Sequence, residues 1–224
     1  MNIDIVVPVL NEAASWLRVQ GRLVALAGHE GVKVWVVDGG STDGTAALAT
    51  QSGLSVIHSE AGRARQMNTG AAAGTGATLL FLHADTQLPP DWQPKLLAGL
   101  SARASWGRFD VRIEGQSALL RVVATLMNWR SRLSGIATGD QAMFMTRGAF
   151  DAVGGFPDQP LMEDIEISKR LLKLSRPACL RQRVTTSGRR WDTRGVWRTI
   201  FLMWRLRFAY WRGRSPAELA QAYR

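Results

Sequence analysis

Two kinds of apolar pattern alternate along the first half of the chain. Four short runs of consecutive apolar residues, rich in valine and isoleucine, are typical of buried strands and occupy residues 3–10, 32–38, 54–59 and 77–85. Between these runs, apolar residues recur at helical spacing in segments 12–28, 40–53 and 63–74, the second of which begins as a turn. Strands that alternate with helices favour a mostly parallel sheet covered on both faces. We therefore predict an α/β fold for this half.

The second half of the chain has a less regular pattern. It predicts one strand at 105–115, a strand, short helix and turn within 141–156, and helices at 117–135, 162–175, 193–213 and 215–224. In the first of these helices, five apolar residues share one face: Leu119, Val122, Val123, Leu126 and Leu133. No repeat or linker interrupts the chain, so we expect a single domain over residues 1–224.

The charge of the chain is uneven and favours an anionic partner. The formal net charge is +10, and from Arg170 onward the acids are Asp192 and Glu218 alone. Nucleic acid, anionic lipid and phosphorylated substrates all suit such a charge. The sequence shows no signal peptide and no apolar window long enough for a membrane span. Together with a single cysteine, Cys179, this predicts a cytoplasmic protein.

Polar residues follow three of the predicted strands at the points where those strands end. Asn11 and Glu12 follow the first, Asp38 ends the second, and Asp85 ends the fourth. Ligands of open parallel sheets bind beyond the carboxyl ends of the strands. Each acid alone is equally well explained as a helix cap or turn former, but their convergence on one edge favours a ligand site. The stretch from Asp38 through Gly40 has neither the lysine of a P-loop nor the spacing of a dinucleotide site, so we expect it to bind a base or ribose.

Four more charged residues begin predicted helices. Arg63 and Arg65 oppose the helix dipole, so they are either solvated surface residues or ligands of a diphosphate. A diphosphate needs its charge neutralised, and Asp85 would hold Mg²⁺ or Mn²⁺ for that purpose. Glu163 and Asp164 either favour the helix dipole or supply a general base.

Several motifs in order resemble the family 2 glycosyltransferases of the GT-A fold. They are "VVPVLNEA", "VVDGGSTDGT", "LLFLHADT", "GDQAMFM" and "MEDIEISKRL". The set that also includes "GRARQMN", "GGFP" and "RRW" is similar to a small bacterial subfamily, the selenodomain-associated transferases. The resemblance covers nearly the whole chain. It implies a nucleotide-sugar donor, a divalent metal and inversion at the anomeric carbon, in a Rossmann-like domain with C-terminal helices.

The resemblance also implies roles for single residues. Residues 1–90 would be the nucleotide-binding half, 91–190 the acceptor and catalytic half, and 191–224 basic helices. Asp85 would bind the metal, and Asp164, with Glu163 beside it, would be the catalytic base. Other positions would bind the nucleotide sugar: Pro8, Asn11, Glu12, Asp38, Gly40, Arg65, Arg190 and Trp191. The motif "GDQAMFM" would place Gly139, Asp140 and Gln141 on the acceptor side.

Two departures from the family pattern change what the resemblance implies. Ser187 stands where processive members have glutamine, which indicates a non-processive enzyme. His83 stands where many members have aspartate, which leaves Asp85 as the single carboxylate of that motif and predicts weak metal binding. The resemblance favours a UDP-sugar donor, whereas the acceptor stays open and includes lipid-linked molecules.

The predicted helix 193–213 combines arginines with aromatic residues. At 100° per residue, four arginines fall within about 40° of one another: Arg194, Arg198, Arg205 and Arg212. Most of the remaining surface is apolar: Trp197, Ile200, Phe201, Met203, Trp204, Phe208 and Trp211. The helix either docks on the anionic inner face of the cell membrane or packs on the core. Arg207 and Arg130 fall on apolar helix faces, where they need an acid or a phosphate as partner.

Two other function classes compete with this interpretation. A nucleotidyltransferase of related fold would carry a glycine-rich basic loop after the first strand, and "PVLNEAASW" lacks one. A non-catalytic basic protein that binds membrane or nucleic acid would explain the charge but not the acids at the strand ends. We therefore expect no nucleic-acid partner.

Overall fold

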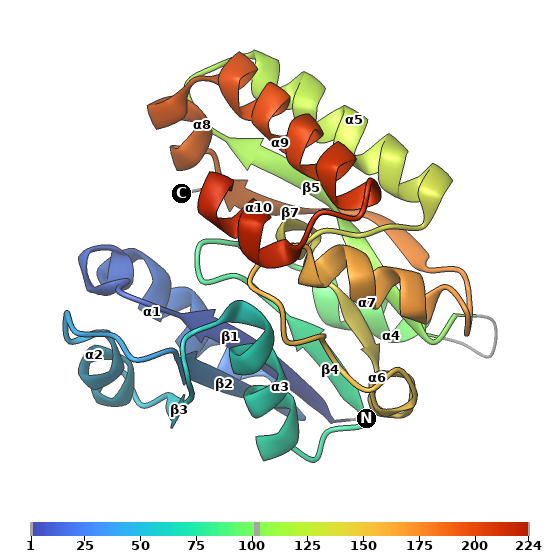
Figure 1. Ribbon diagram of the computed structural model, residues 1–224. Helices are drawn as coiled ribbons and strands as arrows, with labels where there is room; N and C mark the ends of the chain where they lie inside the picture. Colours follow the sequence, from blue (N-terminus) through green and yellow to red (C-terminus); the bar gives the residue numbers. More distant parts are fainter. Residues whose placement is uncertain (1, 101–103, 224) are drawn as a thin grey trace.

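The computed structural model describes residues 2–100 and 104–223, and its centre is a seven-stranded sheet with the order β3-β2-β1-β4-β6-β5-β7 (Figure 1). The strands are β1 Ile3–Val9, β2 Val32–Asp38, β3 Ser55–His58, β4 Thr78–Phe81, β5 Trp106–Glu114, β6 Phe144–Thr146 and β7 Ala178–Ser187. Strands β1 to β4 pair in parallel, as do β5 and β7, whereas β6 is antiparallel to both β4 and β5. Six strands therefore end at one edge of the sheet, which confirms the predicted mostly parallel α/β fold.

Helices cover both faces of the sheet because the side chains of β1 alternate between them. Ile5 and Val7 face the cluster that holds α1 (Ala13–Ala27), α2 (Thr45–Gln51), α4 (Trp92–Gly99) and α5 (Leu119–Ser134). Val6 faces the cluster of α3 (Arg63–Ala73), α6 (Arg147–Ala152) and α7 (Glu163–Leu171). Gly70 lets α3 approach closely, since a β carbon there would lie 2.4 Å from Val6 Cγ1. The result is a sheet between two helical layers.

The C-terminal helices differ from the prediction. Segment 193–213 is not one helix, because Gly195 adopts φ +83° and separates α8 (Arg189–Arg194) from α9 (Val196–Trp211). Helix α10 (Pro216–Tyr223) follows, and residue 224 of its predicted range lies outside the described residues. Buried Leu206 and Leu219 pack with Met162 and Ile165, which fixes α9 and α10 to the start of α7. Helices α9 and α5 run side by side (Figure 1).

The prediction lacked strand β7, helix α4, most of helix α8 and the 3₁₀ turn at Gly139–Gln141, and strand β4 is shorter than expected. Strand β7 lies at the edge of the sheet, where most of its side chains are only partly buried, so its sequence lacks a clear apolar run. Helix α4 is a short helix of weak amphipathic pattern. Strand β4 ends at Phe81, so Asp85 lies in the following turn rather than in the strand.

A buried ion-pair network fastens α5 to the sheet. Asp110 on β5 pairs with Arg108, which is 0% exposed, and with Arg132 Nη2 on α5 at 2.7 Å. Arg108 also donates to Ser131 Oγ and to the Asn128 carbonyl on α5. Each charge of the network therefore has a partner, as burial requires. Among the described residues, no helix combines the length and apolar character needed to cross a bilayer.

Candidate active site

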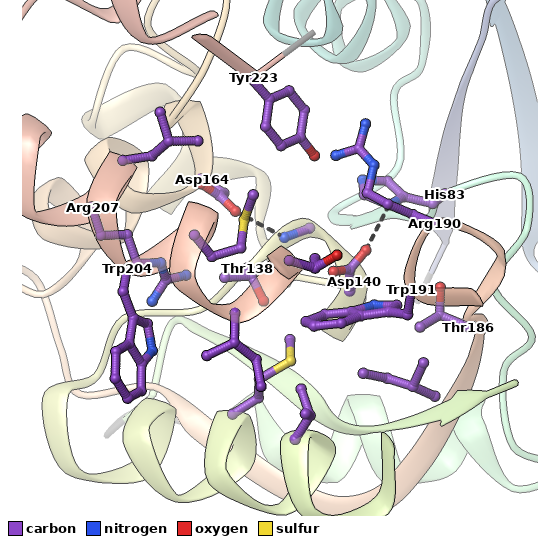
Figure 2. Close-up of a pocket in the computed structure, with 18 of the residues that line it drawn as sticks. His83, Thr138, Asp140, Asp164, Thr186, Arg190, Trp191, Trp204, Arg207 and Tyr223 are labelled. Carbon is purple, nitrogen blue, oxygen red and sulfur yellow. Dashed lines mark hydrogen bonds and ion pairs between the residues drawn. The ribbon is translucent and has the colours of Figure 1, made fainter. Parts of the chain in front are cut away.

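One large cavity of about 1290 Å³ opens where the carboxyl ends of the strands meet α5, α7, α8 and α9 (Figure 2). Its residues come from both halves of the chain. Glu12, Arg63, His83 and Asp85 line the end nearest the first half. Segment 138–140, the start of α7 and the start of α8 line its middle. The cavity therefore joins four of the acids that the sequence had placed at separate strand and helix ends, Glu12, Asp85, Glu163 and Asp164.

Asp164 lies at the start of α7 and faces this cavity. Its Oδ2 accepts a hydrogen bond from the Gly139 backbone N–H at 3.1 Å, and its Oδ1 accepts one from Ile165 at 2.7 Å. Burial and the neighbouring charge of Glu163 raise the pKa of Asp164 to about 6, although these hydrogen bonds and Arg63 act in the opposite direction. A carboxyl with such a pKa exchanges a proton readily near neutral pH.

Glu163 is placed differently from its neighbour. It is buried, and its Oε1 lies 3.3 Å from Arg63 Nη1. This pairing holds Arg63 over the cavity, and the charge of Glu163 acts on the neighbouring Asp164. Met162, just before the pair, has φ +68°, a strained conformation of the kind that collects at functional sites.

Asp140 and Gln141, predicted on the acceptor side with Gly139, point in opposite directions. Asp140 lines the cavity and its Oδ1 lies 3.4 Å from His83 Nδ1. Burial raises the pKa of Asp140, but the hydrogen bond and charge of His83, together with the charges of Arg63 and Arg190, lower it overall. Gln141 is 0% exposed, and its side chain bonds the Thr138 backbone and Asn128. Gln141 therefore stabilises the loop and does not line the cavity.

Asp85 is open to the cavity and has few partners. Its Oδ1 accepts one long hydrogen bond from Thr86 Oγ1 at 3.5 Å. Within residues 2–100 and 104–223, no group of three histidine, cysteine or acidic side chains forms a preformed metal site. A single open carboxylate fits Mg²⁺ or Mn²⁺ when phosphate oxygens and water supply the other ligands. The residues present thus suit a metal that arrives with a diphosphate.

The loops after β1 and β2 are bonded to each other beside the cavity. Asn11, at φ +54°, receives a hydrogen bond from Thr42 N–H and donates its own N–H to Ser41 Oγ. Asp38 is 2% exposed and accepts from the N–H groups of Gly40 and Ser41. Burial raises the pKa of Asp38, but these hydrogen bonds and His58 lower it overall. The second oxygen of Asp38, Oδ1, is buried and has no hydrogen-bond partner within residues 2–100 and 104–223.

Of the predicted donor-binding residues, Glu12, Asp85, Arg190 and Trp191 line the cavity. Pro8, Asn11, Asp38 and Gly40 lie in β1, β2 and their loops, outside its lining. Arg65 lies outside it as well, because residues two apart on a helix point about 200° apart. Arg65 pairs with Glu60 and Asp158, whereas Arg63 takes the position on the cavity that we had expected for Arg65.

Arg190 and Trp191 enter the cavity from the start of α8. The Arg190 guanidinium lies 4.0 Å from the centre of the Tyr223 ring, and burial together with the charges of Arg194 and Arg63 lowers its pKa. Tyr223 was not a predicted site residue, and nothing in its sequence context marks it. Figure 2 shows His83, Arg190 and Tyr223 on one side of the two aspartates, and Trp204 and Arg207 on the other.

The far end of the cavity is apolar and runs between α5 and α9. From α5 a row of exposed residues at helical spacing lines it: Leu119, Val122, Leu126, Trp129 and Leu133. From α9 come Trp197, Ile200, Met203 and Trp204. The face of α5 that the sequence pattern identified therefore borders this groove, and the core side of α5 is formed by Leu120, Val123 and Ala124 instead.

Comparison with known proteins gives a family and a fold. The family model described as glycosyl transferase family 2 matches residues 4–154. A curated relative, beta-monoglucosyldiacylglycerol synthase of Synechocystis sp., is 27% identical over 193 residues, which are 74% of this chain. This chain spans only 40% of that relative.

Solved structures share the fold at low sequence identity. S. aureus TarS in complex with UDP-GlcNAc has a TM-score of 0.65 at 15% identity, over 84% of this chain and 58% of that one. Mycobacterium tuberculosis glucosyl-3-phosphoglycerate synthase with Mn²⁺ and UDP has a TM-score of 0.60 at 20% identity, over 83% of this chain and 70% of that one. Mannosyltransferase PcManGT of Pyrobaculum calidifontis with GDP-Man and Mn²⁺ has a TM-score of 0.65 at 18% identity, over 99% of this chain and 68% of that one.

Proposed function

Because the chain belongs to glycosyl transferase family 2, we propose that it is an inverting, non-processive glycosyltransferase. It moves a sugar from a nucleotide-diphosphate donor to a hydroxyl of an acceptor. The observation that carries the proposal is Asp164, a carboxyl with a raised pKa that faces the same cavity as the open carboxylate of Asp85. A nucleotidyltransferase would need a basic glycine-rich loop after β1, and the loop there consists of Leu10, Asn11 and Glu12.

In the proposed mechanism, Asp164 takes the proton of the acceptor hydroxyl as that oxygen attacks the anomeric carbon. The bond to the diphosphate breaks on the opposite side, which inverts the configuration. Arg63 and Arg190 face the cavity and stabilise the leaving diphosphate through charge-assisted hydrogen bonds. A divalent metal held by Asp85, when bound, neutralises further charge on the same group.

We propose a UDP-sugar as the donor. The unpartnered Oδ1 of buried Asp38 is an acceptor for a base N–H, and the loop from Asp38 to Gly40 lies beside it. Complexes of neighbouring structures contain UDP-GlcNAc, UDP or GDP-Man, so the base needs a direct test. Thermal shifts with UDP, GDP and CDP should show the largest stabilisation with UDP. Stabilisation by GDP alone would contradict this assignment.

A lipid acceptor is supported by the name of the curated relative, a glucosyldiacylglycerol synthase, and by the apolar groove next to Asp164. We also propose that α9 docks on the anionic inner face of the cell membrane. Phe201, Phe208 and Trp211 of α9 are exposed and lie outside the cavity lining. The test of the whole proposal is release of UDP from UDP-glucose and UDP-GlcNAc in the presence of lipid extract, compared between the parent protein and Asp164→Asn.

A further inference from the structure

Arg130 is a charged side chain whose position calls for a ligand. It lies on α5 and lines the cavity, and none of the residues that the structure describes forms a hydrogen bond with its buried Nε and Nη2 atoms. Burial lowers the pKa of Arg130, and the charges of Asp164 and Asp140 only partly offset this effect. A buried guanidinium without hydrogen bonds is costly, so an anionic group bound at this point would stabilise the site.

The surroundings of Arg130 differ from those of the arginines on the donor side. Asp140 acts on both Arg130 and Arg190, but Arg130 is otherwise influenced by Asp164 and Arg108, whereas Arg190 is influenced by Arg194 and Arg63. Arg207 of α9 also lines the cavity, on the side of Asp164 away from Arg190 and His83 (Figure 2). Arg130 of α5 and Arg207 of α9, here called the cationic subsite, thus add two cations to the part of the cavity that these helices line, where an acceptor would bind.

The same subsite opens onto the apolar groove between α5 and α9. The row from Leu119 to Leu133 extends about 21 Å along α5 at 1.5 Å per residue. One leaflet of a bilayer has a hydrocarbon layer of about 15 Å, so the groove is long enough for an acyl chain. A ligand with a negative head at Arg130 and an apolar chain along α5 matches both the charge and the polarity of this part of the cavity.

We infer that the acceptor is an anionic lipid that carries a free hydroxyl. Its phosphate binds Arg130 and Arg207, its chain lies between α5 and α9, and its hydroxyl is presented to Asp164. The inference rests on the proposed function for the role of the lipid as acceptor, and it specifies an anionic class where the name of the curated relative refers to diacylglycerol. Binding of the lipid itself needs neither donor nor turnover.

The test measures binding and transfer separately with two probes of equal chain length. Dioctanoyl phosphatidylglycerol carries a phosphate and free hydroxyls, whereas dioctanoylglycerol carries a hydroxyl and no charge. In the absence of donor, we expect the protein to bind the anionic probe at least tenfold more tightly than the neutral probe. Thermal shift and native mass spectrometry measure both affinities. With UDP-sugar added, the anionic probe should also be the better acceptor.

Variants test whether Arg130 causes the preference for the anionic probe. Arg130→Gln should weaken binding of the anionic probe about tenfold to a hundredfold, the loss of hydrogen bonds to a charged group, and leave binding of UDP unchanged. Arg121→Gln is the matched control, since Arg121 is exposed on the same helix and lies outside the cavity lining. The melting temperature of Arg130→Gln should equal or exceed that of the parent, because no protein partner is lost.

The possible results separate this inference from the proposed function. Binding of the anionic probe that depends on Arg130, without any sugar transfer, would support the subsite and contradict the glycosyltransferase proposal. Sugar transfer to the neutral probe with equal affinity for both lipids would overturn the subsite and leave the enzyme in place. Loss of UDP binding in Arg130→Gln would also overturn it, because Arg130 would then belong to the donor. Dimer formation through the groove without lipid binding would overturn it in favour of a second copy of the chain.

Discussion

At the scale of single residues, the proton affinity of Asp164 controls the proposed chemistry. The carboxyl must be ionised to accept a proton, and its pKa is about 6. Turnover should therefore rise with pH through about pH 6 and fall tenfold per unit below that value. Asp164→Asn should lower kcat by about 10²–10⁴-fold and keep UDP affinity. A pH–rate profile and calorimetry with UDP check both points, and a flat profile between pH 5 and 8 would contradict the role.

A second prediction at this scale concerns metal binding at Asp85. Because its carboxylate has one weak protein partner and the described residues supply no preformed metal site, Mn²⁺ should bind weakly alone and tightly with UDP. Asp85→Asn should remove this synergy and reduce turnover while the fold stays intact. Titration of Mn²⁺ with and without UDP, followed by calorimetry, measures the effect. Asp91→Asn is the control, since Asp91 is exposed and lies outside the cavity lining.

At the scale of elements, the groove depends on how firmly α5 is held to β5. Asp110→Ala would leave Arg108, which is 0% exposed, without its counter-charge. Breaking a buried pair in this way costs about 3–5 kcal/mol, so the free energy of unfolding in urea should fall by that amount. Asp151→Ala changes the charge equally at an exposed position of α6 and should have little effect. Equal losses in both variants would mean that the network is not a main support of α5.

How far the sequence predicts these elements depends on the kind of signal each carries. The strands β1 to β4 and helices α1 to α3 follow from apolar patterns that burial on a central sheet requires. Strand β7 escaped prediction because an edge strand buries few side chains. The break at Gly195 depends on a backbone conformation, φ +83°, that a helical wheel does not represent.

The candidate site likewise contains residues that the sequence placed correctly near the cavity and residues whose direction it did not predict. Acids at strand and helix ends indicated the cavity at Asp85 and Asp164, because topology brings such ends together. The choice between Arg63 and Arg65 depends on tertiary partners, namely Glu163 for the first and Asp158 for the second. Gln141 belongs to a motif but turns inward. Sequence spacing gives the neighbourhood of a side chain, and packing decides its direction.

At the scale of the whole molecule, α9 presents a face suited to an anionic membrane. Arg198, Arg205 and Arg212 are exposed beside the aromatic row, whereas Arg194 belongs to α8 and donates to the Tyr223 carbonyl. Of the four expected stripe arginines, Arg198 and Arg205 therefore lie on α9 and Arg212 lies at its C-cap. Each contributes about 1 kcal/mol near an anionic leaflet.

Liposome sedimentation tests this surface. The protein should pellet with anionic vesicles and stay in solution with neutral ones, because the arginines provide the initial attraction. Replacing Arg198, Arg205 and Arg212 by Gln should abolish pelleting, and replacing Arg18 and Arg121, which are exposed on α1 and α5, should not. Equal pelleting with both kinds of vesicle would show that the aromatic residues alone drive the association.

The exposed apolar residues on α5 and α9 should also affect self-association of the purified protein in solution. Its net charge of +10 keeps molecules apart in dilute buffer, and the Debye length shrinks from about 30 Å at 0.01 M salt to about 3 Å at 1 M. Once repulsion is screened, apolar rows such as that ending at Trp211, 77% exposed, are free to associate. Light scattering should therefore grow as salt is added, and a mild detergent should reverse it. A preparation kept at low ionic strength, or with detergent present, should therefore limit this association during the assays above.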